Sequence, residues 1–144
     1  MASKARSRTG RWAPRLKPLR VLSLRQPWAW LIVNGYKDIE NRSWRTNHRG
    51  PLLIHASSNR SLTSSKNLAA IEKKYRVRLP RDFDFGGIVG VADVVDCVKT
   101  HLSKWKIRGS WGWVLENPRR LPFRRCKGAV GFFRLKPRSS KLRH

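Results

Sequence analysis

The stretch VLSLRQPWAWLIVNGYKDIENRSW, residues 21–44, decides the fold of this chain. Its first four residues are mostly apolar and predict a short strand. A helix is expected next, because Pro27 suits the first helical position and Gly35 suits the left-handed residue that ends a helix. Three apolar side chains fall on one face of this helix: Trp28, Leu31 and Ile32. The stretch therefore predicts a strand that leads into a helix with a buried face.

A run of charged residues follows that helix. Along a strand, side chains alternate between faces, so Glu40, Arg42 and Trp44 share one face. Lys37 has the opposite parity to Glu40 if the strand is unbroken from residue 37. We therefore predict that Lys37 lies in the turn after the helix and that the strand begins near residue 38, or that a bulge intervenes. Either arrangement lets Lys37 and Glu40 enter one cleft.

The rest of the chain alternates apolar segments with turns and has no internal repeat. A second helix is expected within residues 61–75, which carry apolar side chains at helical spacing. The other expected elements are polar turns at 45–50 and 118–128 and strands at 37–44, 51–57, 86–98, 111–117 and 129–135. Five or six strands and two helices predict an α+β domain built around a small β-barrel.

Charge is the strongest compositional signal of the chain: 33 Lys and Arg stand against eight Asp and Glu, a net charge of +25. Residues 21–133 alone carry 21 basic and eight acidic residues, a net charge of +13. Such an excess favours a polyanionic partner, nucleic acid above others, with a solubilising or membrane-surface charge as the alternative. The expected organisation is a disordered basic arm at 1–19, a folded domain at 20–135 and a basic tail at 136–144.

Several other classes of protein are not indicated. No apolar run is long enough to span a membrane, and the N-terminus lacks the apolar segment of a secretory signal. The first 20 residues resemble an organellar transit peptide in composition but lack a helical apolar face, so we expect a cytoplasmic protein. Cys97 and Cys126 lack zinc-like spacing, and Asp93 and Asp96 have opposite strand parity. We expect no metal site, no cofactor and a monomer.

The same segments resemble a known family. LSLRQPWAWLIVNGYKDIENRSWRTNHRGPLLIHAS is similar to the opening of an ASCH domain, and Gly35, Lys37 and Glu40 match the G-x-K-x-x-E signature of that family. GGIVGVADVVDCV, WGWVLENPRRLPF and KGAVGFF then follow in the order of its later strands. The resemblance covers about residues 20–135, and four ordered segments make it far more specific than the signature alone.

The resemblance implies a fold and a range of functions. It implies a PUA-like β-barrel with flanking helices and a cleft that contains the signature lysine. PUA relatives bind RNA, and some small bacterial ASCH members hydrolyse acylated cytidine or RNA. In the acylcytidine hydrolases a hydroxyl residue stands at the position of Glu40, which weakens the case for the same reaction in this chain. Fold analogy does not fix one chemistry.

The candidate site residues form three groups. Lys37 and Glu40 are the candidate catalytic pair, because a partly desolvated lysine beside a carboxylate can donate to a carbonyl or phosphate oxygen, or act as a base if its pKa falls. Residues expected to line the ligand cleft are Gln26, Trp28, Asn41, Arg42, Trp44, His55 and Trp113. Residues expected to bind nucleic acid are Arg45, Arg49, Lys104, Trp105, Lys106 and Arg108. The alternatives are core tryptophans, a hydrogen-bonded core histidine and ordinary solvated loops.

Three functions remain open at this stage. The first is a nucleic-acid-binding module, for RNA rather than DNA, with a nucleotide-sized cleft. The second is a small hydrolase that acts on a modified nucleoside or on RNA phosphodiesters, and the third is a protein-interaction module. A salt-bridged hairpin without function is the alternative for the charged cluster. Since exposed ion pairs contribute only about 0 to 1 kcal/mol, Glu40→Ala is expected to cost little stability while impairing a functional site.

Overall fold

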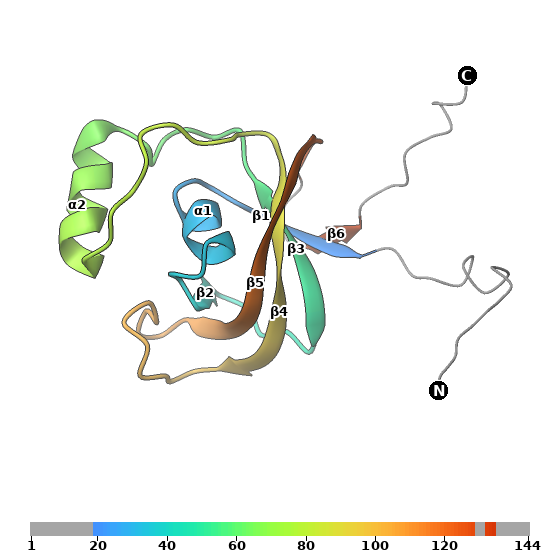
Figure 1. Ribbon diagram of the computed structural model, residues 1–144. Helices are drawn as coiled ribbons and strands as arrows, with labels where there is room; N and C mark the ends of the chain where they lie inside the picture. The colour runs from blue at the N-terminus through green and yellow to red at the C-terminus, as the bar shows by residue number, and fades with distance from the viewer. Residues whose placement is uncertain (1–18, 129–131, 135–144) are drawn as a thin grey trace, which may run out of the picture.

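The computed structural model describes residues 19–128 and 132–134 (Figure 1). Its elements in chain order are β1 (Arg20–Leu24), α1 (Trp28–Val33), β2 (Ile39–Arg42), β3 (Gly50–Ala56), α2 (Ser65–Tyr75), β4 (Gly87–Val98), β5 (Trp111–Arg125) and β6 (Phe132–Arg134). In these ranges neither helix has the length and apolar character needed to cross a membrane. The predicted basic arm and tail lie outside the described residues, apart from Leu19, so their disorder stays a prediction.

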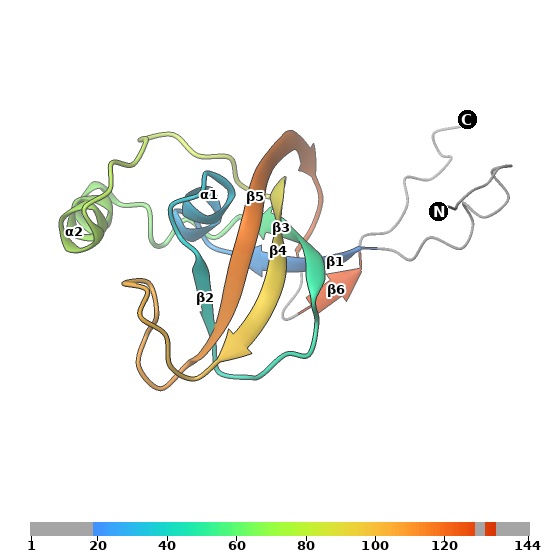
Figure 2. The same cartoon turned by 60° about the horizontal axis from the view of Figure 1, so that its bottom comes forward.

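The six strands form one sheet in the order β2-β5-β4-β3-β1-β6. β1 and β3 pair in parallel, and the other neighbours pair antiparallel. The α+β class and a strongly curled sheet agree with the prediction. The sheet is nevertheless open and not the closed barrel that we expected: in the described residues its edge strands, β2 and β6, have no strand pairing with each other, and the sheet forms a half-barrel (Figure 2).

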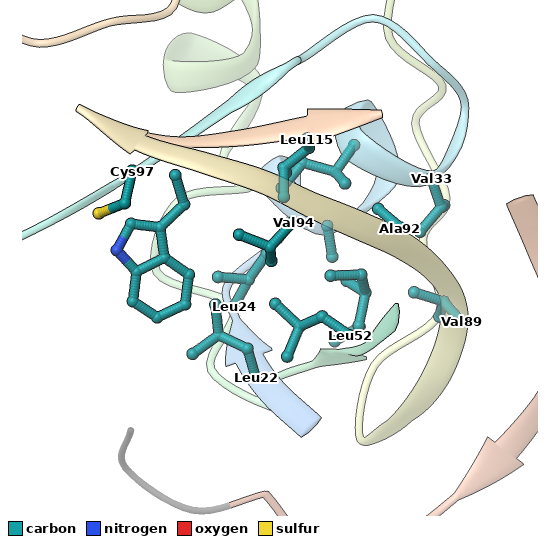
Figure 3. Close-up of a cluster of buried hydrophobic side chains, with 14 residues drawn as sticks. Leu22, Leu24, Val33, Leu52, Val89, Ala92, Val94, Cys97 and Leu115 are labelled. Atoms are coloured by element: carbon teal, nitrogen blue, oxygen red, sulfur yellow. The ribbon is translucent and has the colours of Figure 1, made fainter. Parts of the chain in front are cut away.

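Helix α1 lies inside the curl of the sheet and has apolar neighbours on two sides (Figures 1 and 2). Ile32 and Val33 pack on the inner face of the sheet, in a cluster with Leu22, Leu52, Val94 and Trp113 (Figure 3). Leu31 points to a second cluster with residues of β2, α2 and the 99–110 loop. Because α1 is buried on both sides, its direction is fixed, and so is the position at which the chain leaves its C-terminal end.

The end of α1 places Lys37. Gly35 has a φ of +85°, and its N–H donates to the carbonyl of Ile32, while the N–H of Tyr36 donates to the carbonyl of Leu31. These two bonds form the Schellman arrangement, which favours glycine at the left-handed position. The N–H of Lys37 donates to the same Leu31 carbonyl at 2.9 Å. Lys37 therefore belongs to the helix end, as predicted, and β2 begins at Ile39.

The predicted turn at 118–128 is wrong, because β5 continues to Arg125. Proline cannot donate to a strand ladder, so Pro118 and Pro122 would interrupt regular pairing in this segment. In the structure each proline lies in a β5 segment where the pairing with β4 shifts register, and Asn117, before the first proline, takes a left-handed φ of 54°. The bulges absorb the prolines and let β5 follow the curl of β4.

Candidate functional site

Lys37, Glu40 and Arg42 form a charged cluster along β2, in which Lys37 and Glu40 are buried and Arg42 is half-buried. Lys37 Nζ lies 3.4 Å from Glu40 Oε1 and also donates to the backbone carbonyl of Ile39. Arg42 Nε donates to Glu40 Oε2 at 3.0 Å, and Arg42 Nη2 donates to the carbonyl of Ser23 on β1 at 3.2 Å. Only 6% of Lys37 and 8% of Glu40 is exposed. The structure thus brings the candidate catalytic pair into one place.

Two aromatic rings, Trp28 and Trp105, lie near the ammonium group of Lys37, and a third, Tyr75, packs against both of them. Trp105 and Tyr75 are stacked, with ring centroids 4.1 Å apart, and Trp28 meets both rings edge-on. Lys37 Nζ lies 5.7 Å from the centroid of Trp28 and 6.0 Å from that of Trp105, within the range of cation–π attraction. Burial lowers the pKa of Lys37, and the charge of Arg42 acts in the same direction, while Glu40 opposes both.

The cluster and the aromatic rings line a pocket with a volume of about 280 Å³. We call it the lysine pocket; Leu24, Arg25, Asn41 and Ile107 complete its lining. Pockets for drug-sized ligands run from roughly 300 Å³ upward. A single planar ring system with polar edges suits the lysine pocket better than a whole nucleotide does. The predicted nucleotide-sized cleft therefore needs space beyond it.

A second, larger pocket has a volume of about 840 Å³. We call it the basic pocket. Its cationic lining residues are Arg25, Arg42, Arg125 and Lys127, and its hydroxyl groups come from Ser23, Ser57 and Ser58. Among the residues that the structure describes, no Asp or Glu lines it. Arg25 and Arg42 line both pockets. The two hollows are therefore adjacent and have a common cationic boundary.

His55 lies at the basic pocket and is 2% exposed. Its Nε2 is 2.7 Å from the carbonyl of Cys126, and its Nδ1 is 2.9 Å from the hydroxyl of Ser23. A carbonyl only accepts, so Nε2 carries the proton in this arrangement, and in the neutral ring Nδ1 accepts from Ser23. These contacts agree with the alternative that His55 is a hydrogen-bonded core histidine. His55 also positions Ser23, whose carbonyl accepts from Arg42.

Three predicted binding residues, Gln26, Trp105 and Trp113, are buried and packed or hydrogen-bonded within the domain. Trp113 is fully buried in the core under the sheet, and Trp105, expected in an exposed basic cluster, is only 3% exposed. Gln26 is 2% exposed; its Oε1 accepts from the N–H of Trp30 near the start of α1, and its Nε2 donates to the carbonyl of Asp84. Large aromatic residues in basic sequence suggested exposure, but the 99–110 loop folds inward over α2. Trp105 still contributes one surface to the lysine pocket.

The remaining predicted residues divide between pocket and surface. Asn41 lines the lysine pocket and holds the 99–110 loop by bonds to the backbone of Trp105 and Ile107. Neither pocket is lined by the predicted residues of the 43–49 segment, which are Trp44, Arg45 and Arg49. Arg49 forms an ion pair with Asp96.

The basic side chains of the 99–110 loop differ in their surroundings. Lys104 donates to the carbonyl of Tyr75, and Lys106 donates to the carbonyls of Ile107 and Ser110, whereas Arg108 is exposed. The lysines are thus partly engaged with the protein itself. Their predicted role in binding nucleic acid is neither supported nor contradicted by these contacts.

Sequence reasoning missed several pocket residues. Arg25 directly precedes Gln26 at the end of β1, where a strand opens into a helix, and this position was its only local signal. Tyr75 was assigned to the buried face of the second helix, although its ring also lines the lysine pocket. Arg125 and Lys127 lay in the segment wrongly predicted as a turn. Tyr75, Arg125 and Lys127 are distant from Lys37 in the sequence, and Arg25 is separated from it by α1.

Fold and site together define a small α+β domain with an open, curled sheet and a Lys–Glu–Arg cluster, with buried Lys and Glu, beside a basic pocket. The ASCH domain model matches residues 22–123, which is most of the chain. The chain belongs to the ASCH domain family. In the described ranges, no group of three or more His, Cys, Asp or Glu is placed to hold a metal ion.

Two related proteins are cointegrators. The chain is 40% identical over 83 residues to activating signal cointegrator 1 of Mus musculus and 39% identical over 83 residues to that of Homo sapiens. Each match covers 54% of this chain but only 14% of the relative. The likeness is therefore confined to a small part of those larger proteins.

Proposed function

We propose that this ASCH domain binds single-stranded RNA and accepts one nucleobase in the lysine pocket. The observation that carries the proposal is the juxtaposition of a ring-sized pocket, walled by aromatic side chains, with a larger pocket lined by cations. Bases present a flat π-face and a polar edge, while their backbone presents negative charge. The lysine pocket offers a partner for the base, and the basic pocket offers one for the backbone. The resemblance of the sequence to PUA-like domains supports the same proposal.

The polar groups of the lysine pocket suit a base that carries an amino group. A carboxylate accepts from an exocyclic amino group, as Glu40 would from cytosine or adenine. Lys37 has only donors and suits a ring nitrogen or carbonyl next to that amino group. Both residues are already oriented by Ile39 and Arg42, so little side-chain ordering is needed on binding. We expect cytosine or adenine to be preferred over uracil.

The charge of the domain supports an RNA backbone as the partner. Residues 21–133 have a net charge of +13, and this charge must be neutralised by counter-ions or by a polyanion. Affinity for RNA should therefore fall steeply as salt concentration rises. Binding that is undetectable at low salt would remove the basis of the proposal.

The test compares two conservative substitutions of acids. Glu40→Gln removes the carboxylate from the lysine pocket, whereas the matched control Glu72→Gln removes one on α2, outside both pockets. Both changes raise the net charge by one and should slightly favour unspecific RNA binding. We expect Glu40→Gln to weaken binding of a short C- or A-containing oligoribonucleotide by about 1 to 3 kcal/mol and Glu72→Gln not to weaken it. Fluorescence anisotropy on folded protein measures both; equal effects would contradict the proposal.

A hydrolase is the second candidate, and the lowered pKa of Lys37 beside Glu40 is the observation that favours it. Such a pair can transfer a proton during amide or phosphodiester cleavage. Incubation with RNA and with an acylated cytidine distinguishes the two candidates. Turnover that Lys37→Met abolishes would assign the pocket to catalysis; unchanged substrates that still bind would assign it to recognition.

A further inference from the structure

We propose that the basic pocket is a phosphate subsite, which takes a phosphate group of the nucleotide whose base occupies the lysine pocket. This inference rests on the proposed function for its base-binding half. The ligand class is a nucleoside phosphate or an RNA strand, and the recognised group is the anionic phosphate itself. The proposal follows from the composition of the pocket, from the lack of an acidic partner for three of its cations and from its connection to the lysine pocket.

The composition of the basic pocket favours a phosphate. Four cationic side chains and three serine side chains line it, and within residues 19–128 and 132–134 its lining includes no acid. Arginine forms planar pairs of hydrogen bonds with phosphate oxygens, and hydroxyl groups donate to the oxygens that remain. The acids of this chain lie elsewhere: Asp82 and Asp84, for example, line a separate pocket near Trp30. An anion in the basic pocket would meet no repulsive side chain from its lining.

Three of the four cations of the basic pocket lack the acidic partner that several other arginines of the domain have, and the fourth, Arg42, pairs with Glu40. Arg119 pairs with Asp93, Arg81 with Glu72 and Arg49 with Asp96. In the described part of the chain, Arg25, Arg125 and Lys127 form no ion pair with an acid. Their charges are therefore not neutralised by a carboxylate of the described domain. A bound phosphate would supply the counter-charge.

A continuous set of contacts connects the basic pocket to the lysine pocket. Arg42 bonds to Glu40 in the lysine pocket and to the carbonyl of Ser23 at the basic pocket. The Ser23 hydroxyl bonds to His55, which bonds to the carbonyl of Cys126. A Cβ on Gly128 would lie 2.6 Å from His55 Cε1 and 2.8 Å from Ser23 Oγ, so the chain packs tightly against this pair. Arg42, which lines both pockets, is thus held by Glu40 on one side and by the carbonyl of Ser23 on the other.

The first experiment uses small ligands and requires no RNA binding. Backbone amide signals of Ser57, Ser58 and Gly86 are followed by NMR during titration with inorganic phosphate, with CMP and AMP, and with cytidine and adenosine. We expect phosphate to shift these signals and each monophosphate to bind about tenfold more tightly than its nucleoside. Absence of phosphate-induced shifts, together with equal affinities for nucleotide and nucleoside, would overturn the proposal.

Three variants that each remove one positive charge test whether the preference for monophosphates depends on the basic pocket. Arg125→Gln and Lys127→Gln each remove one charge from the basic pocket. The control Arg120→Gln removes one charge from β5, the strand that carries Arg125, outside that pocket. The two pocket variants should lose several-fold of the monophosphate advantage, and the control should retain it. Equal losses in all three variants would show a general charge effect and would contradict a defined subsite.

The second experiment separates this proposal from the RNA-binding proposal. A short RNA is prepared with one neutral methylphosphonate linkage at each position in turn. One position should weaken wild-type binding by about tenfold and have little further effect in Arg125→Gln. If RNA binds without such a position, the subsite proposal fails and RNA binding stands. If RNA does not bind but phosphate shifts the Ser57 and Ser58 signals, the subsite stands and the RNA proposal fails.

Discussion

Two acidic residues of this domain each hold an arginine, but in different surroundings. Glu40 lies on β2, is 8% exposed and is bonded by Arg42 at 3.0 Å and by Lys37 at 3.4 Å. Glu72 lies on α2 and is bonded by Arg81 at 3.1 Å and by the backbone N–H of Leu79 at 2.8 Å. The contact distances to arginine are nearly the same. The difference lies in burial and in the additional buried lysine.

The difference in burial distinguishes the ion pair of Glu72, which joins two surface segments, from the candidate site around Glu40. Glu72 joins the end of α2 to the 76–82 segment, and both members of its ion pair reach solvent. Glu40 keeps an ammonium and a guanidinium group together inside a pocket, where desolvation is costly. Charged groups in such a position are weak evidence for stability. An ionisable group with a perturbed pKa in a pocket, here Lys37, is instead a candidate for function.

The largest expected effect concerns stability and corrects our sequence-based expectation. We expected Glu40→Ala to cost little, on the assumption of an exposed pair, but the structure shows that the pair is buried. Removal of one partner leaves Lys37 without its carboxylate in the interior. Glu40→Ala should therefore lower the free energy of unfolding by about 3 kcal/mol, measured by urea denaturation. Glu72→Ala should have a much smaller effect.

A double variant sharpens this expectation. Lys37→Met combined with Glu40→Gln removes the buried ammonium together with its counter-charge, and Arg42 is exposed enough to be solvated. We expect it to be more stable than Glu40→Ala. A loss below about 1 kcal/mol in Glu40→Ala would place Glu40 with surface pairs such as that of Glu72.

The next effect concerns the aromatic side chains. Trp28 lines the lysine pocket beside Glu40, whereas Trp44 is 36% exposed and lines neither pocket. Trp28→Leu should weaken RNA binding by about 1 to 2 kcal/mol because one base loses a stacking surface, and Trp44→Leu should change it much less. Fluorescence anisotropy gives both values. The reverse order would move the base-binding surface to the 43–49 segment.

A smaller effect is expected in the pH dependence of stability. Burial lowers the pKa of Lys37 below its ordinary value of 10.5. Between the lowered pKa and 10.5, the unfolded chain binds more protons than the folded chain, so stability rises with pH. Wild type should gain stability relative to Lys37→Met across this window, in urea unfolding at a series of alkaline pH values. A constant difference would mean that Lys37 titrates as in the unfolded chain.

The smallest effect is expected for Glu72 in acid. Hydrogen bonds from Arg81 and from the N–H of Leu79 hold the pKa of Glu72 below its ordinary value of 4.5. Its contribution to stability is present above 4.5 and is lost as pH falls through the lowered pKa. The difference between wild type and Glu72→Gln should shrink toward zero in acid. Thermal unfolding at several acidic pH values measures it, and a difference that persists in strong acid would require another cause.

Part of the site could be predicted from local sequence. Gly35 after an apolar helix indicated a left-handed end, and this end explains why Lys37 joins Glu40 despite its strand parity. Both residues lie within a few positions of that glycine, so local backbone geometry was sufficient. Trp105 and Trp113 were misplaced because exposure depends on which surface covers a residue, and in both cases that surface comes from segments distant in sequence.

The sequence by itself determined the local elements: α1 with its glycine end, the strands up to β4, the charge of the domain and the family signature. These depend on spacing, on turn chemistry and on composition. Only the tertiary structure decided that β5 passes its two prolines by shifts in register, that the sheet stays open, and that Arg25, Arg125 and Lys127 meet around one pocket. The physical reason is that curvature, burial and pocket composition arise from pairing and packing between distant segments, which no local pattern specifies.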